Sequence, residues 1–271
     1  MVTRIVRCGH IIRTEQYSYY PGHEASIIRL DADRYMVRST GEIRYYDHAD
    51  NRSDGKAYMA LRRSMRDLRD IINSNVEDTK DIQWVTLTYA DNMTCAEQLY
   101  EDHRRYWQRY IRYLGGISAP RPEYITAVEP QERGAWHMHT LYFFPRGSRP
   151  WVSNDDLARL WGHGYVMIDR LRDDLSGVTN VGAYLTAYLT DVVKDGKSVK
   201  GGRLHLYPPR MRYWRASRGI KRPIVEWVSD DDADKIISPA VGSARLTWES
   251  VSDRLSDGHH QSIRYRQYII D

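Results

Sequence analysis

The chain has 271 residues, enough to bury a full core in one domain with appendages. Its net charge is +4, and arginine, whose planar guanidinium suits bidentate contacts with phosphate, supplies most of the positive charge. The two cysteines exclude a disulfide framework, and no apolar run is long enough to span a membrane or to act as a secretory signal. We therefore expect a soluble protein of the cytoplasm, with no membrane partner.

The first 55 residues are polar and rich in tyrosine, and they predict an N-terminal appendage or a DNA-facing arm. Within them, residues 34–46 indicate a hairpin around the glycine turn at Gly41. Residues 57–75 then place apolar side chains at helical spacing with arginines between them. We expect this basic amphipathic helix to pack its apolar side on the core and to leave its arginines in water.

The next elements alternate in type along the chain. Strands are predicted over residues 84–89, 124–129, 136–144 and 164–169. Helices are predicted over residues 94–114, 155–161 and 181–192, capped respectively by Thr94, Ser153 and either Thr179 or Asn180. The order β-α-β-β-α-β-α with short connections predicts an α+β fold, in which helices pack on one face of a central antiparallel sheet.

Two histidines lie two residues apart on the strand over residues 136–144. His137 and His139 therefore project from the same face and can share one metal ion. If the preceding strand places Glu129 opposite His137, its carboxylate becomes the third ligand; Glu132, in the turn, is the competing candidate. Two imidazoles and a carboxylate suit a divalent ion with open positions. The plainer interpretation is a pair of hydrogen-bonded core histidines.

The last predicted helix carries two tyrosines, one turn apart on its apolar side. Tyr184 and Tyr188 belong to a stripe that runs from Val181 to Val192. The plain interpretation is aromatic packing. The functional one is that both hydroxyls reach the metal site, where a cation can compensate for the high pKa of a phenol, about 10. The tyrosines are informative only together with the histidines.

Residues 196–225 contain no acidic residue. Cations that follow phosphates and rings that stack on bases are typical of single-strand binding, although such a run is also typical of a solvated face. The candidate DNA-binding residues are Arg203, Arg210, Arg212, Tyr213, Trp214, Arg215, Arg218, Lys221 and Arg222. An acidic cluster after Trp227 indicates a boundary, so we expect a nuclease domain over residues 56–225 and a C-terminal extension over 226–271, with a strand at 262–270.

Taken together, the motifs resemble those of rolling-circle replication initiators, the Rep proteins of the HUH endonuclease superfamily. The matching pieces are Val85-Thr-Leu-Thr88, then Glu129-Pro-(x)6-His137-Met-His139, then Tyr184-(x)3-Tyr188, over about residues 57–222. The resemblance implies a ferredoxin- or RRM-like core, whose five-stranded antiparallel sheet carries the histidines on a central strand. In one departure, Ala187 stands where many relatives have a lysine.

The resemblance also implies an activity. A tyrosine would attack single-stranded or hairpin origin DNA, leaving a 5′-phosphotyrosine link and a free 3′-OH for the host polymerase. Mg²⁺ or Mn²⁺, held by Glu129, His137 and His139, would orient the phosphate. By analogy Tyr188 would act first and Tyr184 at termination. Because the chain has no helicase motif, a host helicase or supercoiling would separate the strands of the phage, virus or plasmid in the host cytoplasm.

Three alternatives remain open at this stage. A tyrosine transposase or relaxase of the same superfamily would share the chemistry, but relaxases place their tyrosines before the histidines. A single-stranded nucleic-acid-binding protein without catalysis would explain the arginines and tyrosines and leave the histidines unexplained. A metal-dependent phosphodiesterase that uses water would need the histidines and have no use for the tyrosine pair.

Overall fold

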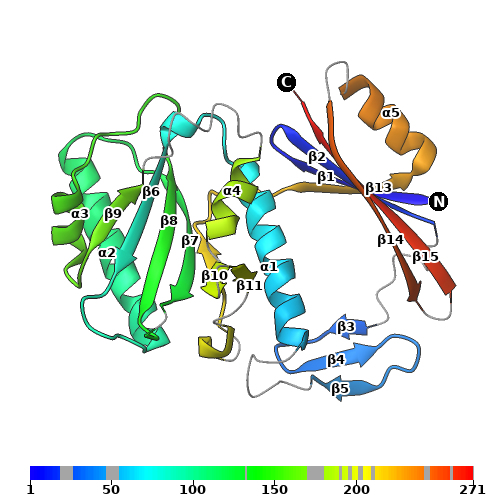
Figure 1. The fold of residues 1–271 in the computed structure, drawn as a ribbon, viewed down its shortest axis with the longest axis horizontal. Coiled ribbons are helices and arrows are strands. Elements are labelled where there is room, and N and C mark those ends of the chain that lie inside the picture. The colour runs from blue at the N-terminus through cyan, green and yellow to red at the C-terminus, as the bar shows by residue number, and fades with distance from the viewer. Residues whose placement is uncertain are drawn as a thin grey trace.

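The structure, a computed structural model, is a mixed α+β protein with several antiparallel sheets, two of them five-stranded (Figure 1). It describes residues 1–18, 27–46, 55–131, 133–169, 180–188, 191–194, 197–200, 204–208, 211–240, 245–256 and 259–270. Among these residues, no helix combines the length and the apolar character that crossing a bilayer requires.

One five-stranded sheet, the central sheet, has the strand order β12-β7-β8-β6-β9, and all its pairs are antiparallel. Its strands are β6 (Ile82–Thr88), β7 (Glu123–Pro130), β8 (Trp136–Phe143), β9 (Val166–Asp169) and β12 (Trp214–Ala216). The histidine strand β8 is the middle strand, as its apolar residues on both faces predicted. Sequence patterns did not indicate β12, which comes from the basic segment.

Helices cover both faces of the central sheet, so the expectation of helices on one face is wrong. Helices α2 (Ala96–Gly116) and α3 (Asn154–Trp161) pack on the face that carries Met138 and Tyr142. Helices α1 (Gly55–Asn73) and α4 (Val181–Tyr188) pack on the face that carries Leu141 (Figure 1). Because β8 is apolar on both sides, each face needs its own cover.

The second five-stranded sheet, here the terminal sheet, has the order β13-β1-β2-β15-β14 and unites the two ends of the chain. Its strands are β1 (Val2–Cys8), β2 (Ile11–Tyr17), β13 (Ile224–Ser229), β14 (Arg245–Ser256) and β15 (His259–Ile269). Helix α5 (Asp230–Ala240) packs on one face, where Ala233 meets Ile5 and Ile12. The opposite face is turned toward α1 (Figure 1).

Two smaller sheets complete the described fold. The three-stranded sheet comprises β3 (Ile27–Arg29), β4 (Arg34–Val37) and β5 (Ile43–Tyr45), and the two-stranded one comprises β10 (Asp191–Lys194) and β11 (Lys197–Lys200). The β4–β5 hairpin confirms the predicted glycine turn, because Gly41 has a φ of 69°, in the left-handed region that suits glycine.

The predicted order of elements from β6 to α4 is confirmed, and two details are wrong. Cys95, not Thr94, occupies the N-cap of α2, while the Thr94 carbonyl accepts a hydrogen bond from the Trp136 indole at 2.9 Å. Helix α4 ends at Tyr188 instead of continuing to Val192, because the β-branched Val192 pairs with Val199 in the β10–β11 hairpin. Ser153 caps α3 and Asn180 caps α4, as predicted.

Candidate metal centre

Glu129, His137 and His139 come together on one face of the β7–β8 hairpin. The register of the two strands places Glu129 directly opposite His137, which is the pairing that the sequence required for a third ligand. The hairpin holds this register because its connection is short and its alternating residues fill the cores on both faces. The three donors therefore stand on rigid, paired backbone.

The donor atoms lie close enough to surround one ion. The Oε2 atom of Glu129 lies 3.8 Å from Nε2 of His137 and 3.4 Å from Nε2 of His139. The donor atoms of all three residues lie within 4.8 Å of one another. Because nitrogen and oxygen ligands bind small divalent ions at about 2.0–2.2 Å, donors that share an ion lie at most about 4.4 Å apart. The group thus needs only small side-chain adjustments to bind a metal.

A neighbouring strand orients one of the imidazoles. The hydroxyl of Thr86, on β6, lies 3.1 Å from Nδ1 of His139, which faces it across the β6–β8 ladder. This contact leaves Nε2 of His139, the atom beside Glu129, as the nitrogen available to a metal. Metal-bound histidines commonly use their second ring nitrogen for such an orienting hydrogen bond. The side chains of the triad are only 10–16% exposed, which limits competition from water.

The tyrosine helix α4 packs on the same face of the central sheet as the triad. Val181, at its start, belongs to the core that includes Ala127 and Leu141, and these residues alternate along β7 and β8 with the same phase as Glu129 and His139. The backbone positions of Tyr184 and Tyr188 lie within α4, and their side chains lie outside the described part of the chain. Glu132, the competing ligand, also lies outside it.

The start of α4 is fixed by buried polar contacts with the end of α1. The Oδ1 atom of Asn73 accepts a hydrogen bond from the Gly182 backbone at 2.8 Å, and its Nδ2 donates to Oδ1 of Asn180 at 2.9 Å. Gly182 approaches so closely that an added Cβ atom would collide with the Arg69 carbonyl. The glycine therefore lets α4 lie against α1, above the triad face.

The structure distributes the predicted DNA-binding residues in different ways. The side chains of Arg212, Arg215, Arg218, Lys221 and Arg222 are exposed. Lys221 forms an ion pair with Glu77 at 2.7 Å, and Arg215 lies over the Tyr100 ring at 3.4 Å. The acid that the basic segment lacks is thus supplied from a distant part of the sequence. Arg203 and Arg210 lie outside the described residues.

The two aromatic residues of that set serve the core in this structure. Tyr213 is 6% exposed and packs among the side chains beneath α2, so its ring is not accessible for stacking on a base. Trp214 is half-buried, and its indole donates to the Ser64 carbonyl of α1 at 3.0 Å. Their place on or beside the edge strand β12 explains the burial: alternate residues of this strand face the two covered sides of the sheet.

Two groups near the site were not singled out from the sequence. Thr86 lies in the first matching motif, and its polar hydroxyl within an apolar strand was the available signal. The arginines of α1 were expected in water, yet Arg62, Arg63, Arg66 and Arg69 line a cavity in front of the terminal sheet. Their signal was the absence of acids among them from residue 59 to residue 66.

Comparisons with known proteins agree with the geometry. A family model described as a replication-associated protein, of the ORF2 and gene 2 protein type, matches residues 82–193, from the start of β6 to the third residue of β10. All three sequence motifs fall within this range, so the match confirms the family resemblance. No curated protein and no solved structure matches the chain.

Proposed function

We propose, because residues 82–193 form a domain of this replication-associated protein family, that the chain nicks and rejoins one strand of origin DNA to start rolling-circle replication. In this proposal the central sheet and its helices are an HUH endonuclease core of the ferredoxin- or RRM-like type. The single observation that carries the proposal is the register of Glu129 with His137, which assembles a metal-binding group on the sheet face that α4 covers.

The proposed reaction is a transesterification at phosphorus. The phenol oxygen of Tyr188 or Tyr184 attacks the phosphate, a P–O bond to the tyrosine forms, and the bond to the 3′ oxygen breaks. The phenol gives up its proton and the departing 3′ oxygen gains one, so no cofactor is consumed. Rejoining is the reverse attack by a 3′-OH, and it needs no ATP because one phosphoester bond replaces another.

Each residue of the centre has a defined part in this proposal. Glu129, His137 and His139 hold Mg²⁺ or Mn²⁺, which supplies positive charge to the phosphate oxygens when it is bound. Thr86 positions His139. Packing of α4 against α1 carries the tyrosines on the face that holds the ion, and burial excludes bulk water as a competing nucleophile.

The free 3′-OH left by the nick would serve a host DNA polymerase, with strand separation by a host helicase. These partners follow from the proposed reaction, because the chain itself would supply only the cut and the covalent link. A transposase or a relaxase of the same superfamily is the second candidate; the order of motifs, with histidines before tyrosines, favours replication initiation.

The direction of the covalent link gives a sharp test. The full-length protein is incubated with Mn²⁺ and single-stranded DNA that contains a randomised stretch, labelled in parallel at its 3′ or its 5′ end. A 5′-phosphotyrosine link transfers only the 3′ label to a species that survives SDS on a denaturing gel. Sequencing of the captured DNA then identifies the preferred site.

Matched variants separate the proposal from its rivals. The double variant Tyr184→Phe/Tyr188→Phe should form no adduct, whereas Tyr165→Phe, at a tyrosine that is 81% exposed beside the edge strand β9, should behave as the wild type. Cleavage without an adduct would support a hydrolase that uses water. Binding without cleavage in the presence of Mn²⁺ would support a non-catalytic DNA-binding protein.

A further inference from the structure

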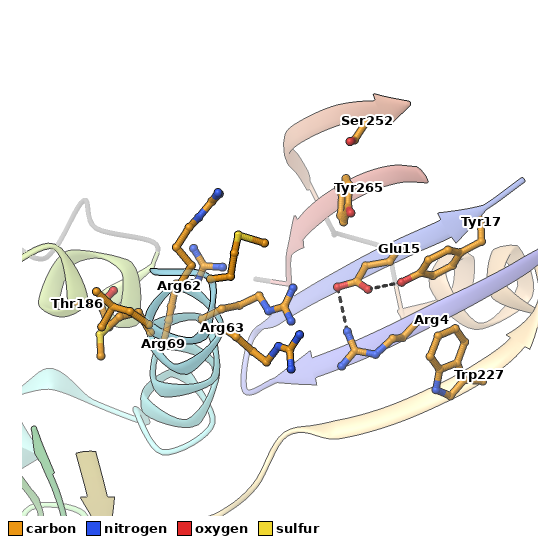
Figure 2. A pocket seen from close by; sticks show the side chains of 14 residues that line it. Arg4, Glu15, Tyr17, Arg62, Arg63, Arg69, Thr186, Trp227, Ser252 and Tyr265 are labelled. Atoms are coloured by element: carbon orange, nitrogen blue, oxygen red, sulfur yellow. Dashed lines mark hydrogen bonds and ion pairs between the residues drawn. The ribbon is translucent and has the colours of Figure 1, made fainter. Parts of the chain in front are cut away.

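A cavity of about 820 Å³ lies between α1 and the terminal sheet. Figure 2 shows it from close by, with arginines of α1 on one side and side chains of the terminal sheet opposite. Thr186 of the tyrosine helix α4 also lines it. The cavity therefore adjoins the helix that carries the proposed nucleophiles, and it is separate from the metal-binding group.

The α1 wall of the cavity is strongly positive. Arg62, Arg63, Arg66 and Arg69 lie on the side of the helix opposite Leu61, Leu68 and Ile72, which pack on the central sheet. Among the residues that the structure describes, the guanidinium groups of Arg62, Arg63 and Arg66 make no hydrogen bond or ion pair. Four cations on two successive turns repel one another, so this wall favours a polyanion in front of it.

The opposite wall combines aromatic rings with an internally neutralised pair of charges. Trp227, Arg4, Glu15 and Tyr265 form one row across four neighbouring strands of the terminal sheet. Arg4 binds Glu15 at 2.9 Å, and the Tyr17 hydroxyl donates to the same carboxylate at 2.8 Å (Figure 2). Glu15, the only acid that lines the described cavity, is thereby neutralised. What remains toward the cavity are rings and excess positive charge.

Specific contacts hold the two walls at their separation. Arg13 of the terminal sheet forms a buried ion pair with Asp70 of α1. At the same end, Asn180, which caps α4, donates to Gln267 of the terminal sheet at 3.3 Å. The cavity is thus a built space between two anchored elements, open to solvent along the exposed Arg62 and Arg63.

We infer that this cavity is a channel for single-stranded DNA that flanks the bond cut at the centre, an inference that rests on the proposed function. The α1 arginines contact phosphates, and the rings of Tyr17, Trp227 and Tyr265 stack on bases. Cationic tracks facing aromatic platforms bind single strands without sequence preference. The terminal sheet thereby acts as a clamp that keeps the strand beside α4 between cutting and rejoining.

The test measures equilibrium binding of a fluorescent oligothymidylate, a single strand with no designed cleavage site, by anisotropy over a range of salt concentrations and without divalent metal. The cleft variant is Arg62→Gln/Arg63→Gln/Arg66→Gln in the full-length protein. Loss of three phosphate contacts should lower the slope of log K against log salt by about 2, since each contact on single strands contributes about 0.7. Affinity at low salt should fall at least about tenfold.

The matched control removes three exposed arginines from α2, on the far face of the central sheet, as Arg104→Gln/Arg105→Gln/Arg112→Gln. It changes the net charge equally and should leave the slope as in the wild type. A second variant, Tyr265→Leu, tests stacking without altering charge and should weaken binding without changing the slope. Circular dichroism and thermal unfolding establish that each variant is folded.

Two results would overturn the inference: an unchanged slope in the folded cleft variant, or an equal loss in the α2 control. Tighter binding of a duplex of the same length, with the same loss in the cleft variant, would also overturn it in favour of duplex binding. Failure of the proposed function reads differently. In that case the wild type forms no covalent adduct with DNA and Mn²⁺, whatever the cleft variant does to oligothymidylate binding.

Discussion

The hydroxyl of Thr86 lies 3.1 Å from Nδ1 of His139 and leaves the other ring nitrogen toward Glu129. When Nε2 binds a metal, Nδ1 carries the proton and donates it to this hydroxyl, which fixes the ring. The change Thr86→Val keeps the shape and removes the acceptor. We expect Mn²⁺ affinity to fall about tenfold to a hundredfold, the usual effect of losing such a contact, as measured by calorimetric titration.

Thr88→Val on the same strand is the control for that titration. The Thr88 hydroxyl donates to the Tyr165 carbonyl at 2.8 Å instead of to an imidazole of the centre, so Mn²⁺ affinity should stay within about twofold of the wild type. His205→Ala, at an exposed histidine, controls for adventitious binding. Equal affinity in Thr86→Val and the wild type would show that Thr86 does not orient the ligand.

Asn73 fixes the start of the tyrosine helix, and its removal should affect stability and reaction together. In Asn73→Ala the buried Gly182 amide loses its acceptor, which we expect to cost about 1–3 kcal/mol in the free energy of unfolding. Denaturant titration measures that loss. Adduct formation should also slow at temperatures where the variant is fully folded. Asn75→Ala, which loses contacts to Lys221 only at the surface, should leave the adduct rate unchanged.

Gly182 and Gly115 offer a contrast between two helical glycines. In Gly182→Ala the new methyl group meets the Arg69 carbonyl and comes within 2.8 Å of Oδ1 of Asn73. Such overpacking should destabilise the protein by about 1–3 kcal/mol. Gly115→Ala has no neighbouring atom within 4 Å and should be stabilising by about 0.5–1 kcal/mol, because alanine favours the helix. Thermal unfolding of both variants checks the opposite signs.

His103 should make the protein less stable in mild acid. Burial, assisted by nearby Arg215, lowers the pKa of His103 to about 4 from an ordinary value of about 6.5. The unfolded chain therefore binds a proton that the folded one resists as the pH falls from about 6.5 to about 4. Stability present above this window is lost within it, by up to about 3 kcal/mol.

The variant His103→Gln removes this titration and retains a group that can bond to Thr126, the present partner at 3.3 Å. Unfolding free energies at about pH 7 and about pH 4.5 should then differ less than in the wild type. An identical difference in both proteins would assign the acid sensitivity to other groups.

The metal-binding group was predictable from the sequence because its geometry is local. Two histidines two apart on a strand must share a face, and a short hairpin leaves few registers that could place Glu129 beside them. The order of elements in the central sheet followed for the same reason. Helices on both faces follow from the apolar residues on both sides of β8, whose meaning for helix placement was missed.

The terminal sheet was not predictable in this way. It joins residues from the two ends of the chain, as in the hydrogen bond from Thr3 to Asp230 at 2.8 Å, and pairing at such separation leaves no periodic signature. The wall opposite α1 therefore could not be anticipated, and Arg62 and Arg63 had the pattern of a solvated helix face. Likewise, a run of cations around Tyr213 gives no sign that the ring itself is buried.

The central claim is that a phenol of α4 forms a covalent bond to DNA beside an ion held by Glu129, His137 and His139. Its most direct test is peptide mapping of the SDS-resistant adduct by mass spectrometry after nuclease digestion. The account predicts a nucleotide on Tyr188 or Tyr184, formed with Mn²⁺ and lost in His139→Ala. A nucleotide on any other residue, or an adduct that forms equally in His139→Ala, would contradict it.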